Sequence, residues 1–381
     1  MNPLSVWNYY RNNIKKLMPV FIAVSLSVFL LYTVQMLIFS AFRTEYLAFV
    51  KSHEYFSYIK PIGKLMDQEL IDSVKNQKSV EYVLPFIFNY TNITNTLGDV
   101  TGTKILSMKS EDTKLMMSRI GLSLTAGRLP VPGSDEVALH SLVAENKGLR
   151  IGDKVGKQVN GREFYPGSHT ISGILDGESI ISFDSLETWL ETNKITNPLK
   201  YGMVILPVKG HSDEMNAFLD SLYTGSIDLK TPGSASSQHY ESVNSVGMIL
   251  TLIDLIIITI VSLCAGFLFY IFFNQRRVEF GILNAIGFTR QQIINKAIAE
   301  IAGLNAAGFL TGIAIAVLAA LLFNWFMFIP KGQLLLIWDA GYIERLLCVP
   351  VFVTLFSIIP VWRMLDKLDP VSIIEGEGWI W

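Results

Sequence analysis

Residues 17–42 read LMPVFIAVSLSVFLLYTVQMLIFSAF and contain no Asp, Glu, Lys or Arg. The hydrocarbon core of a bilayer is about 30 Å thick, so about 20 apolar residues in a helix cross it. Three later runs are also long enough, and they cover residues 246–273, 301–330 and 346–362. Inside lipid the backbone must satisfy its own hydrogen bonds. The sequence therefore predicts four transmembrane helices.

A cleaved signal peptide is the alternative for the first run, because Arg11, Lys15 and Lys16 precede it. The apolar region of a signal peptide spans only about 7–15 residues, and residues 17–42 form a far longer run. We therefore expect a retained membrane anchor.

Composition argues against several classes of function. Charged residues make up 17% of the 381 residues, below the roughly 25% usual for soluble domains. The formal net charge of −2 gives no basis for nucleic-acid binding. Both cysteines, Cys264 and Cys348, lie in apolar runs. Residues 43–243 therefore have neither a disulfide framework nor a cysteine-based metal site.

Lys and Arg in the short flanks of the apolar runs predict the orientation, since cytoplasmic loops carry an excess of these residues. Most flanking basic residues fall beside one end of the helices: Arg11, Lys15, Lys16, Arg276, Arg277, Arg290, Lys296, Arg363 and Lys367. The short loop at the other end has only Lys331 and Arg345. We expect a multi-pass membrane protein with both termini in the cytoplasm and residues 43–243 outside.

The predicted fold is an α-helical membrane protein with an α+β extracytoplasmic domain inserted between the first and second helices. Its segments are a cytoplasmic or interfacial helix (1–16), transmembrane helix 1 (17–42), the extracytoplasmic domain (43–243), transmembrane helix 2 (244–273), a cytoplasmic segment (274–296), transmembrane helix 3 (297–330), a short outer loop (331–345), transmembrane helix 4 (346–362) and a cytoplasmic tail (363–381).

The inserted domain has both strand and helix patterns, which is typical of the α+β class. Asn160-Gly161 lies between residues 154–159 and 162–165 and predicts a hairpin. Further strands are expected at 169–175 and 201–208, and helices at 61–78, 141–147, 185–193 and 213–223. The Gly- and Ser-rich residues 231–237 predict a linker back to the membrane.

No catalytic or metal-ligating constellation is evident in the inserted domain. Its histidines lack a metal-ligand spacing, and GxSxG is absent. Asp135 and Glu136 are adjacent, and neighbours on a strand point to opposite faces. We expect a folded domain that binds a protein or peptide, with no catalytic residues and no metal.

Two segments carry a family resemblance. The first is GRLPVPGSDEVALHSLVAENKGLRIGDKV, residues 127–155, in which a strand-like DEVAL precedes a short helix and a Gly-Asp turn. The second is RRVEFGILNAIGFTRQQIINKAIAEI, residues 276–301. Both resemble the FtsX-like and MacB-like permeases of bacterial ABC transporters, as does the tail LDPVSIIEGE, residues 368–377. The resemblance implies a MacB-like core domain outside and a coupling segment between helices 2 and 3.

A transporter requires a source of energy, and this chain has no P-loop. Gly63-Lys64 and Gly156-Lys157 lack the earlier glycine and the Ser or Thr that the phosphate-binding loop needs. We therefore expect no enzymatic activity and no cofactor in this chain. ATP and Mg²⁺ are expected in a partner ABC ATPase, and the resemblance implies a second permease subunit, identical or different.

The segment between helices 2 and 3 has helical periodicity. Val278, Ile282, Ala285 and Ile286 recur at helical spacing, as do Phe280 and Leu283. Gly287 allows a break, and Thr289 is placed to cap the next helix. A helix docked in a partner's groove and a helix lying on lipid headgroups both fit this pattern. The resemblance implies ATPase docking, with these coupling residues: Arg277, Glu279, Phe280, Ile282, Leu283, Ala285, Ile286, Gly287 and Arg290.

Polar and small residues in the apolar runs are further candidates. Asp254 is charged within a run, which favours a polar path or a position near the membrane surface. Glu300 lies at the start of the third run. Gly308 and Gly312 form GxxxG, a pattern typical of close helix packing, within one chain or between two.

The resemblance thus implies a permease subunit that couples ATP hydrolysis by a separate ATPase to conformational change outside the membrane. It would export or extract a peptide, antibiotic, lipoprotein or lipid. One alternative is a signalling subunit that activates a cell-wall hydrolase or senses an antimicrobial peptide. The other is a membrane-anchored receptor or enzyme.

Overall fold

The computed structural model describes residues 6–98, 100–223, 225–333 and 335–366. The Asp-Pro tail motif at 368–377 lies outside these residues. The chain divides into two compact units. One is the membrane unit, comprising Met1–Met36, Val246–Phe323 and Leu336–Trp381; the other is the inserted domain, comprising Leu37–Ser245 and Asn324–Leu335.

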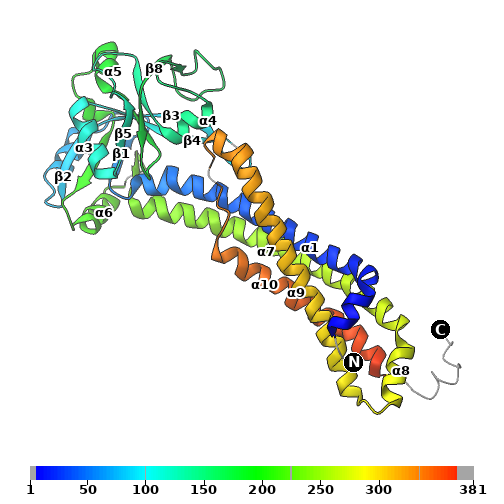
Figure 1. Ribbon diagram of the computed structural model, residues 1–381. Helices are drawn as coiled ribbons and strands as arrows, with labels where there is room; N and C mark the ends of the chain where they lie inside the picture. The colour runs from blue at the N-terminus through cyan, green and yellow to red at the C-terminus, as the bar shows by residue number, and fades with distance from the viewer. Residues whose placement is uncertain (1–5, 99, 224, 334, 367–381) are drawn as a thin grey trace. The chain divides into compact units, whose positions relative to one another are not determined.

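Within the described residues, four helices are long and apolar enough to span a membrane (Figure 1). They belong to α1 (Val6–Glu45), α7 (Pro232–Gln275), α9 (Arg290–Phe323) and α10 (Ala340–Asp366). A short helix, α8 (Arg277–Ala285), follows α7. The four predicted transmembrane helices are therefore confirmed.

Small residues bring the membrane helices into close contact. A Cβ atom added to Gly312 on α9 would lie 2.6 Å from the Ser25 carbonyl oxygen of α1, and one on Gly308 would lie 3.0 Å from Val24 Cγ1. On α7, a Cβ on Gly266 would lie 3.7 Å from the Cα of Ser357 on α10. Because lipid is as apolar as the helices, such close approach is a main source of their association. Gly308 and Gly312 thus pack helices within one chain.

The inserted domain has a seven-stranded mixed sheet in the order β3-β4-β9-β6-β8-β5, with β7 paired to β8. Its strands are β3 (Ile87–Thr94), β4 (Val100–Met108), β5 (Ser123–Gly127), β6 (Glu136–His140), β7 (Lys154–Val155), β8 (His169–Asp176) and β9 (Ile181–Ser185). Three helices accompany it: α3 (Ser110–Ile120), α4 (Ser141–Lys147) and α5 (Leu186–Asn193).

A second, four-stranded sheet has the order β11-β1-β10-β2. It consists of β1 (Ser57–Pro61), β2 (Val80–Pro85), β10 (Met203–Pro207) and β11 (Ile227–Lys230), with α2 (Gln68–Lys75) and α6 (Ser212–Ser221). One apolar core contains Leu106 and Phe183 of the first sheet together with Tyr58 and Val204 of the second. The two sheets therefore fold as one α+β domain, as expected.

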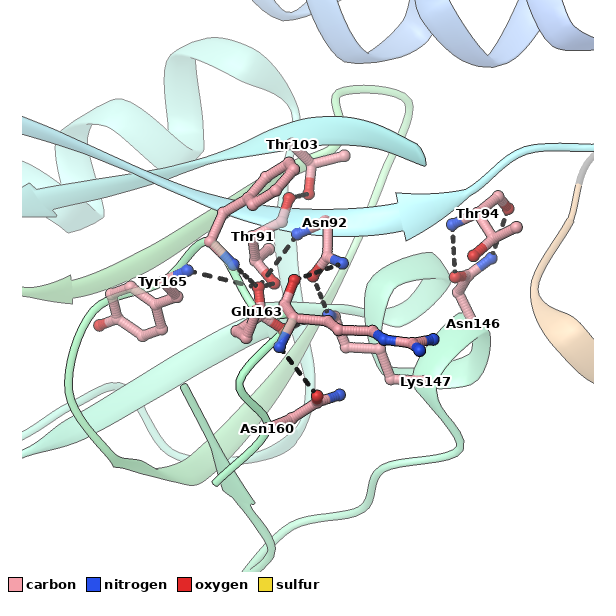
Figure 2. A network of polar contacts seen from close by, with 11 residues as sticks. Thr91, Asn92, Thr94, Thr103, Asn146, Lys147, Asn160, Glu163 and Tyr165 are labelled. Carbon is pink, nitrogen blue, oxygen red and sulfur yellow. Dashed lines mark hydrogen bonds and ion pairs between the residues drawn. The ribbon is translucent and has the colours of Figure 1, made fainter. Parts of the chain in front are cut away.

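The predicted hairpin at Asn160-Gly161 is wrong. Residues 156–168 form a compact loop in which the Lys157 amide donates to the Tyr165 carbonyl at 2.7 Å. Figure 2 shows the cause: the Glu163 side chain lies among the groups that bind it. Its Oε1 accepts from Thr91 Oγ1 at 3.0 Å and from the Asn92 amide at 3.1 Å, and Lys147 Nζ pairs with its Oε2.

This buried carboxylate fixes the loop to β3. Burial by itself raises the pKa of Glu163, but the hydrogen bond and charge of Lys147 outweigh it and hold the pKa below its usual value. The carboxylate also accepts from the Phe164 amide at 2.9 Å. Asn-Gly favours a hairpin locally, and these tertiary bonds override that preference.

Two other expectations need correction. Residues 231–237 are not a flexible linker, because α7 already begins at Pro232 and Ser236 Oγ donates to the Pro232 carbonyl at 2.9 Å. Proline suits the first helical turn, where its missing N–H is not needed. The helix expected at 61–78 is only α2, since Pro61 belongs to β1. The helices expected at 141–147, 185–193 and 213–223 correspond to α4, α5 and α6.

Candidate functional site

Helix α8 is held between two breaks in the backbone. Arg276 precedes it with non-helical angles (φ −101°, ψ 10°), and Gly287 follows with φ +106°, which favours glycine. Thr289 then caps α9: its Oγ1 accepts from the Gln292 amide at 3.4 Å, and Gln292 Oε1 accepts from the Thr289 amide at 2.9 Å. This reciprocal pair is a capping box. The predicted break and cap are both present.

The two faces of α8 differ in exposure. Phe280 and Leu283 are buried, and the Phe280 ring stacks on Phe273 of α7 with centroids 5.8 Å apart. On the other face Val278, Ile282 and Ile286 are 59%, 49% and 70% exposed. We call these three residues the α8 stripe. The buried face fixes α8 to the bundle and leaves the stripe available.

Arg276 joins α8 to the bundle through ion pairs. Its Nε donates to Glu279 Oε2 at 2.8 Å, and its Nη1 donates to Glu300 Oε2 at 2.6 Å. Lys296 adds a second cation, with its Nζ 3.4 Å from Glu279 Oε1 and 3.9 Å from Glu300 Oε1. Two cations face two carboxylates, so the cluster carries no formal net charge. We call these four residues the Arg276 anchor.

Aromatic rings enclose the same guanidinium. Arg276 Cζ lies 3.7 Å from the ring centroid of Tyr9 on α1 and 4.9 Å from that of Phe280. A cation over an aromatic face is attracted to it, more strongly where water is excluded. Next to Tyr9, Tyr10 Oη donates to the Glu300 carbonyl oxygen. The end of α7, α8, α9 and the start of α1 therefore meet at one arginine.

Electrostatics favour the charged forms of Arg276 and Glu279. Burial by itself lowers the pKa of Arg276, but its hydrogen bonds to Glu279 and Glu300 outweigh burial and raise the pKa above its usual value. Burial likewise tends to raise the pKa of Glu279, and the Arg276 hydrogen bond and charge outweigh it, so that pKa is lowered. Arg276 and Glu279 therefore form a charged pair at neutral pH.

The predicted coupling residues separate into three groups. Ile282 and Ile286 lie on the exposed stripe, and Arg277, Ala285, Gly287 and Arg290 are also exposed. Phe280 and Leu283 face inward. Glu279, one of the expected coupling residues, lies in the Arg276 anchor. Sequence reasoning did not include Tyr9, Arg276 or Lys296 among the site residues, although Lys296 and Glu300 have the i, i+4 spacing of an ion pair.

The other predicted intramembrane carboxylate, Asp254, lies where three helices meet. Gln35 Nε2 of α1 donates to Asp254 Oδ2 at 2.9 Å. Arg345 of α10 is close enough for its charge to act on Asp254. Asp254 is half-buried. A carboxylate at this depth is thus compensated inside the bundle.

No group of three or more His, Cys, Asp or Glu side chains with metal-ligand geometry occurs among the described residues. The inserted domain does contain a buried lysine, Lys104, whose Nζ lies 3.2 Å from Ser52 Oγ and 2.7 Å from His53 Nδ1. Burial lowers the pKa of Lys104 well below its usual value, and the charge of Lys230 adds to this.

Comparison with known proteins gives one family and several solved domains. Residues 240–367 match the FtsX-like permease C-terminal family. The periplasmic region of MacB from Actinobacillus actinomycetemcomitans is similar at 10% identity and a TM-score of 0.30, over 49% of this chain and 94% of that one. The extracellular domain of the noncanonic ABC-type transporter YknZ from Gram-positive bacteria is similar at 13% identity and a TM-score of 0.27, over 46% of this chain and 99% of that one.

The family match covers most of α7 and all of α8, α9 and the described part of α10. These are the helices that carry the Arg276 anchor and the α8 stripe, and they follow the inserted domain in the order that the sequence motifs predict. By this match, residues 240–367 belong to the FtsX-like permease C-terminal family.

Proposed function

We propose that this chain is the permease subunit that transmits motion from a separate ABC ATPase to the inserted domain. The observation that carries the proposal is α8, a short helix with an exposed apolar stripe and a buried ionic anchor. The stripe offers Val278, Ile282 and Ile286 at successive turns of one face. Helix-in-groove recognition uses this spacing.

The Arg276 anchor makes α8 a suitable lever. Displacing α8 alone would separate Arg276 from Glu300, whose side chains are only 8% and 3% exposed. Breaking a buried ion pair costs about 3–5 kcal/mol, so α8 moves together with α7, α9 and the start of α1. A force applied to the stripe therefore reaches three membrane helices at once.

In this proposal α8 and both termini are cytoplasmic, and the inserted domain lies outside. The excess of Lys and Arg in the flanks near α8 supports the orientation. ATP and Mg²⁺ belong to the ATPase, since this chain has no P-loop. A second permease subunit, identical or different, completes the transporter. The cargo is a peptide, an antibiotic, a lipoprotein or a lipid.

The α8 stripe could contact lipid headgroups in place of an ATPase, and one experiment distinguishes these two partners. The chain is co-expressed with an ABC ATPase from the same genome, and co-purification and ATP hydrolysis in lipid are measured. Ile282→Asp should abolish co-purification, because it places a charge in the proposed interface. Val131→Asp, which changes an exposed apolar residue of the inserted domain, is the matched control and should leave it intact.

The proposal fails if Ile282→Asp co-purifies with the ATPase as well as wild type does and hydrolyses ATP at the same rate. If the stripe instead contacts lipid headgroups, Ile282→Asp should detach α8 from the membrane and leave the complex with the ATPase unchanged. Fluorescence of a probe attached at position 286 in place of Ile286 distinguishes the two environments.

A further inference from the structure

Helices α1 and α9 touch at two levels and separate between them. At the first level, a Cβ atom added to Gly303 would lie 2.8 Å from Tyr10 Oη. At the second level, a Cβ atom added to Gly308 would lie 3.0 Å from Val24 Cγ1. Between these contacts is a groove of about 390 Å³. Ligand pockets have volumes of about 300–1,000 Å³, so the groove is large enough for part of a ligand.

The backbone of α1 explains why the groove exists. Asn13 departs from helical geometry (φ −123°, ψ 21°), and Pro19 lies inside the helix. Proline has no N–H to donate to the preceding turn, which bends a helix. Opposite this stretch, α9 presents the small side chain of Ala307. The bend and the small residue together leave the space unfilled.

The walls of the groove are apolar, and its single charged residue is at the rim. Ile14, Met18, Phe21 and Leu304 line it together with Ala307, and the charged residue is Arg11. Ile14 and Met18 are 58% and 43% exposed. Both walls belong to helices that are apolar enough to cross a membrane, so we expect lipid beside the groove.

The Arg11 guanidinium lacks an acceptor in the structure. Among the described residues it is exposed and has neither a hydrogen bond nor an ion pair. The sequence around it adds Lys15 and Lys16, and the first acidic residue of the chain is Glu45. The nearby carboxylates of Glu279 and Glu300 are paired with Arg276 and Lys296, so the excess charge near the groove is positive and attracts an anion.

We propose that the groove binds one anionic phospholipid, with an acyl chain between α1 and α9 and the phosphate on Arg11. Guanidinium binds phosphate oxygens through two parallel N–H donors. Basic pockets between transmembrane helices are suited to anionic headgroups. A lipid seated here also contacts Tyr10, which lines the groove and donates to the Glu300 carbonyl of the anchor. The proposal is independent of ATPase docking.

Native mass spectrometry of the full chain in detergent tests the proposal, with equal amounts of phosphatidylglycerol and phosphatidylcholine added. Wild type should retain one phosphatidylglycerol in preference to phosphatidylcholine. Arg11→Gln should lower that preference about fivefold, the ratio that corresponds to about 1 kcal/mol per basic residue. Lys16→Gln removes a nearby charge that does not line the groove and should have a smaller effect.

A second arm tests the acyl-chain contact. Ala307→Trp should fill the groove and abolish lipid retention, whereas Leu310→Trp, at an exposed site outside the groove, should not. For the wild type, a phosphatidylglycerol with a photoreactive acyl chain should label the peptide that contains Met18 and Phe21. This measurement requires no variant to fold.

The proposal is overturned by equal effects of Arg11→Gln and Lys16→Gln, which would indicate unspecific attraction of anions. Lipid retention by folded Ala307→Trp would also overturn it. So would labelling confined to other helices, or a cross-link from the groove to a second copy of the chain, because another occupant would then fill the groove.

Discussion

Replacing Arg276 tests the structural basis of the lever most directly. Arg276→Met keeps much of the apolar stem and removes the guanidinium that pairs with Glu300 and Glu279. Removing one partner of a buried pair costs about 3–5 kcal/mol, because the other charge stays buried. Glu300 retains Lys296 at 3.9 Å, so the low end of this range, about 3 kcal/mol, is the expected loss of unfolding free energy.

Replacing Glu279 provides a comparison for the loss of unfolding free energy in Arg276→Met. Its side chain is 41% exposed, and ion pairs open to solvent contribute only about 0–1 kcal/mol. Glu279→Gln should therefore destabilise the chain by about 1 kcal/mol or less. Arg276→Met should cost more because its pair with Glu300 is buried and because the guanidinium also contacts Glu279 and the Tyr9 ring.

Unfolding in mixed SDS and detergent micelles, followed by circular dichroism, measures these free energies. Arg277→Met is the matched control, because Arg277 is the exposed neighbour in the same turn. The double variant Arg276→Met/Glu300→Gln should recover part of the loss, since no carboxylate is then left without its partner. A loss for Arg276→Met equal to that for Arg277→Met, or no recovery in the double variant, would refute the reasoning.

Three further predictions concern packing and protonation. Gly312→Val should loosen α1 from α9 and lower the melting temperature in detergent more than Ala314→Val does, because the new side chain meets the Ser25 carbonyl at 2.6 Å. Lys104→Met should make the stability of the full chain less dependent on pH below 10.5, because the depressed pKa of Lys104 makes its protonation favour unfolding; melting curves of both proteins at several pH values measure the difference. Above its usual pKa of 4.5, ionised Glu163 should stabilise the folded chain, and this stabilisation should be lost as the pH falls through the lower pKa of the folded state. Glu163→Gln should remove this pH dependence from melting curves recorded at acid pH.

Much of the fold was predictable because its causes are local. Residues 17–42 must form a helix in lipid whatever else they touch, since no other structure satisfies their backbone. Gly287 and Thr289 end one helix and begin the next through their own conformational and capping preferences. The helix α4 was predicted with its exact bounds, 141–147.

Other features depend on partners that are distant in the sequence. Asn160-Gly161 predicts a hairpin, but Glu163 turns inward to meet Thr91 and Lys147, which belong to β3 and α4. The spacing of apolar residues in α8 also does not show which of its faces is buried and which is exposed. Phe280 and Ile282 are both apolar, and only the position of Phe273 shows which one is buried.

The sequence by itself determined the four membrane helices, the inserted α+β domain, and the family motif that α8 belongs to. Hydropathy and helix breaks act over a few turns of chain, so they are visible without a structure. Only the tertiary structure decided that Arg276 pairs with Glu300 under the ring of Tyr9, and that α1 leaves a groove against α9 at Ala307. Charge pairing and packing depend on distances in space, and three separate helices set those distances.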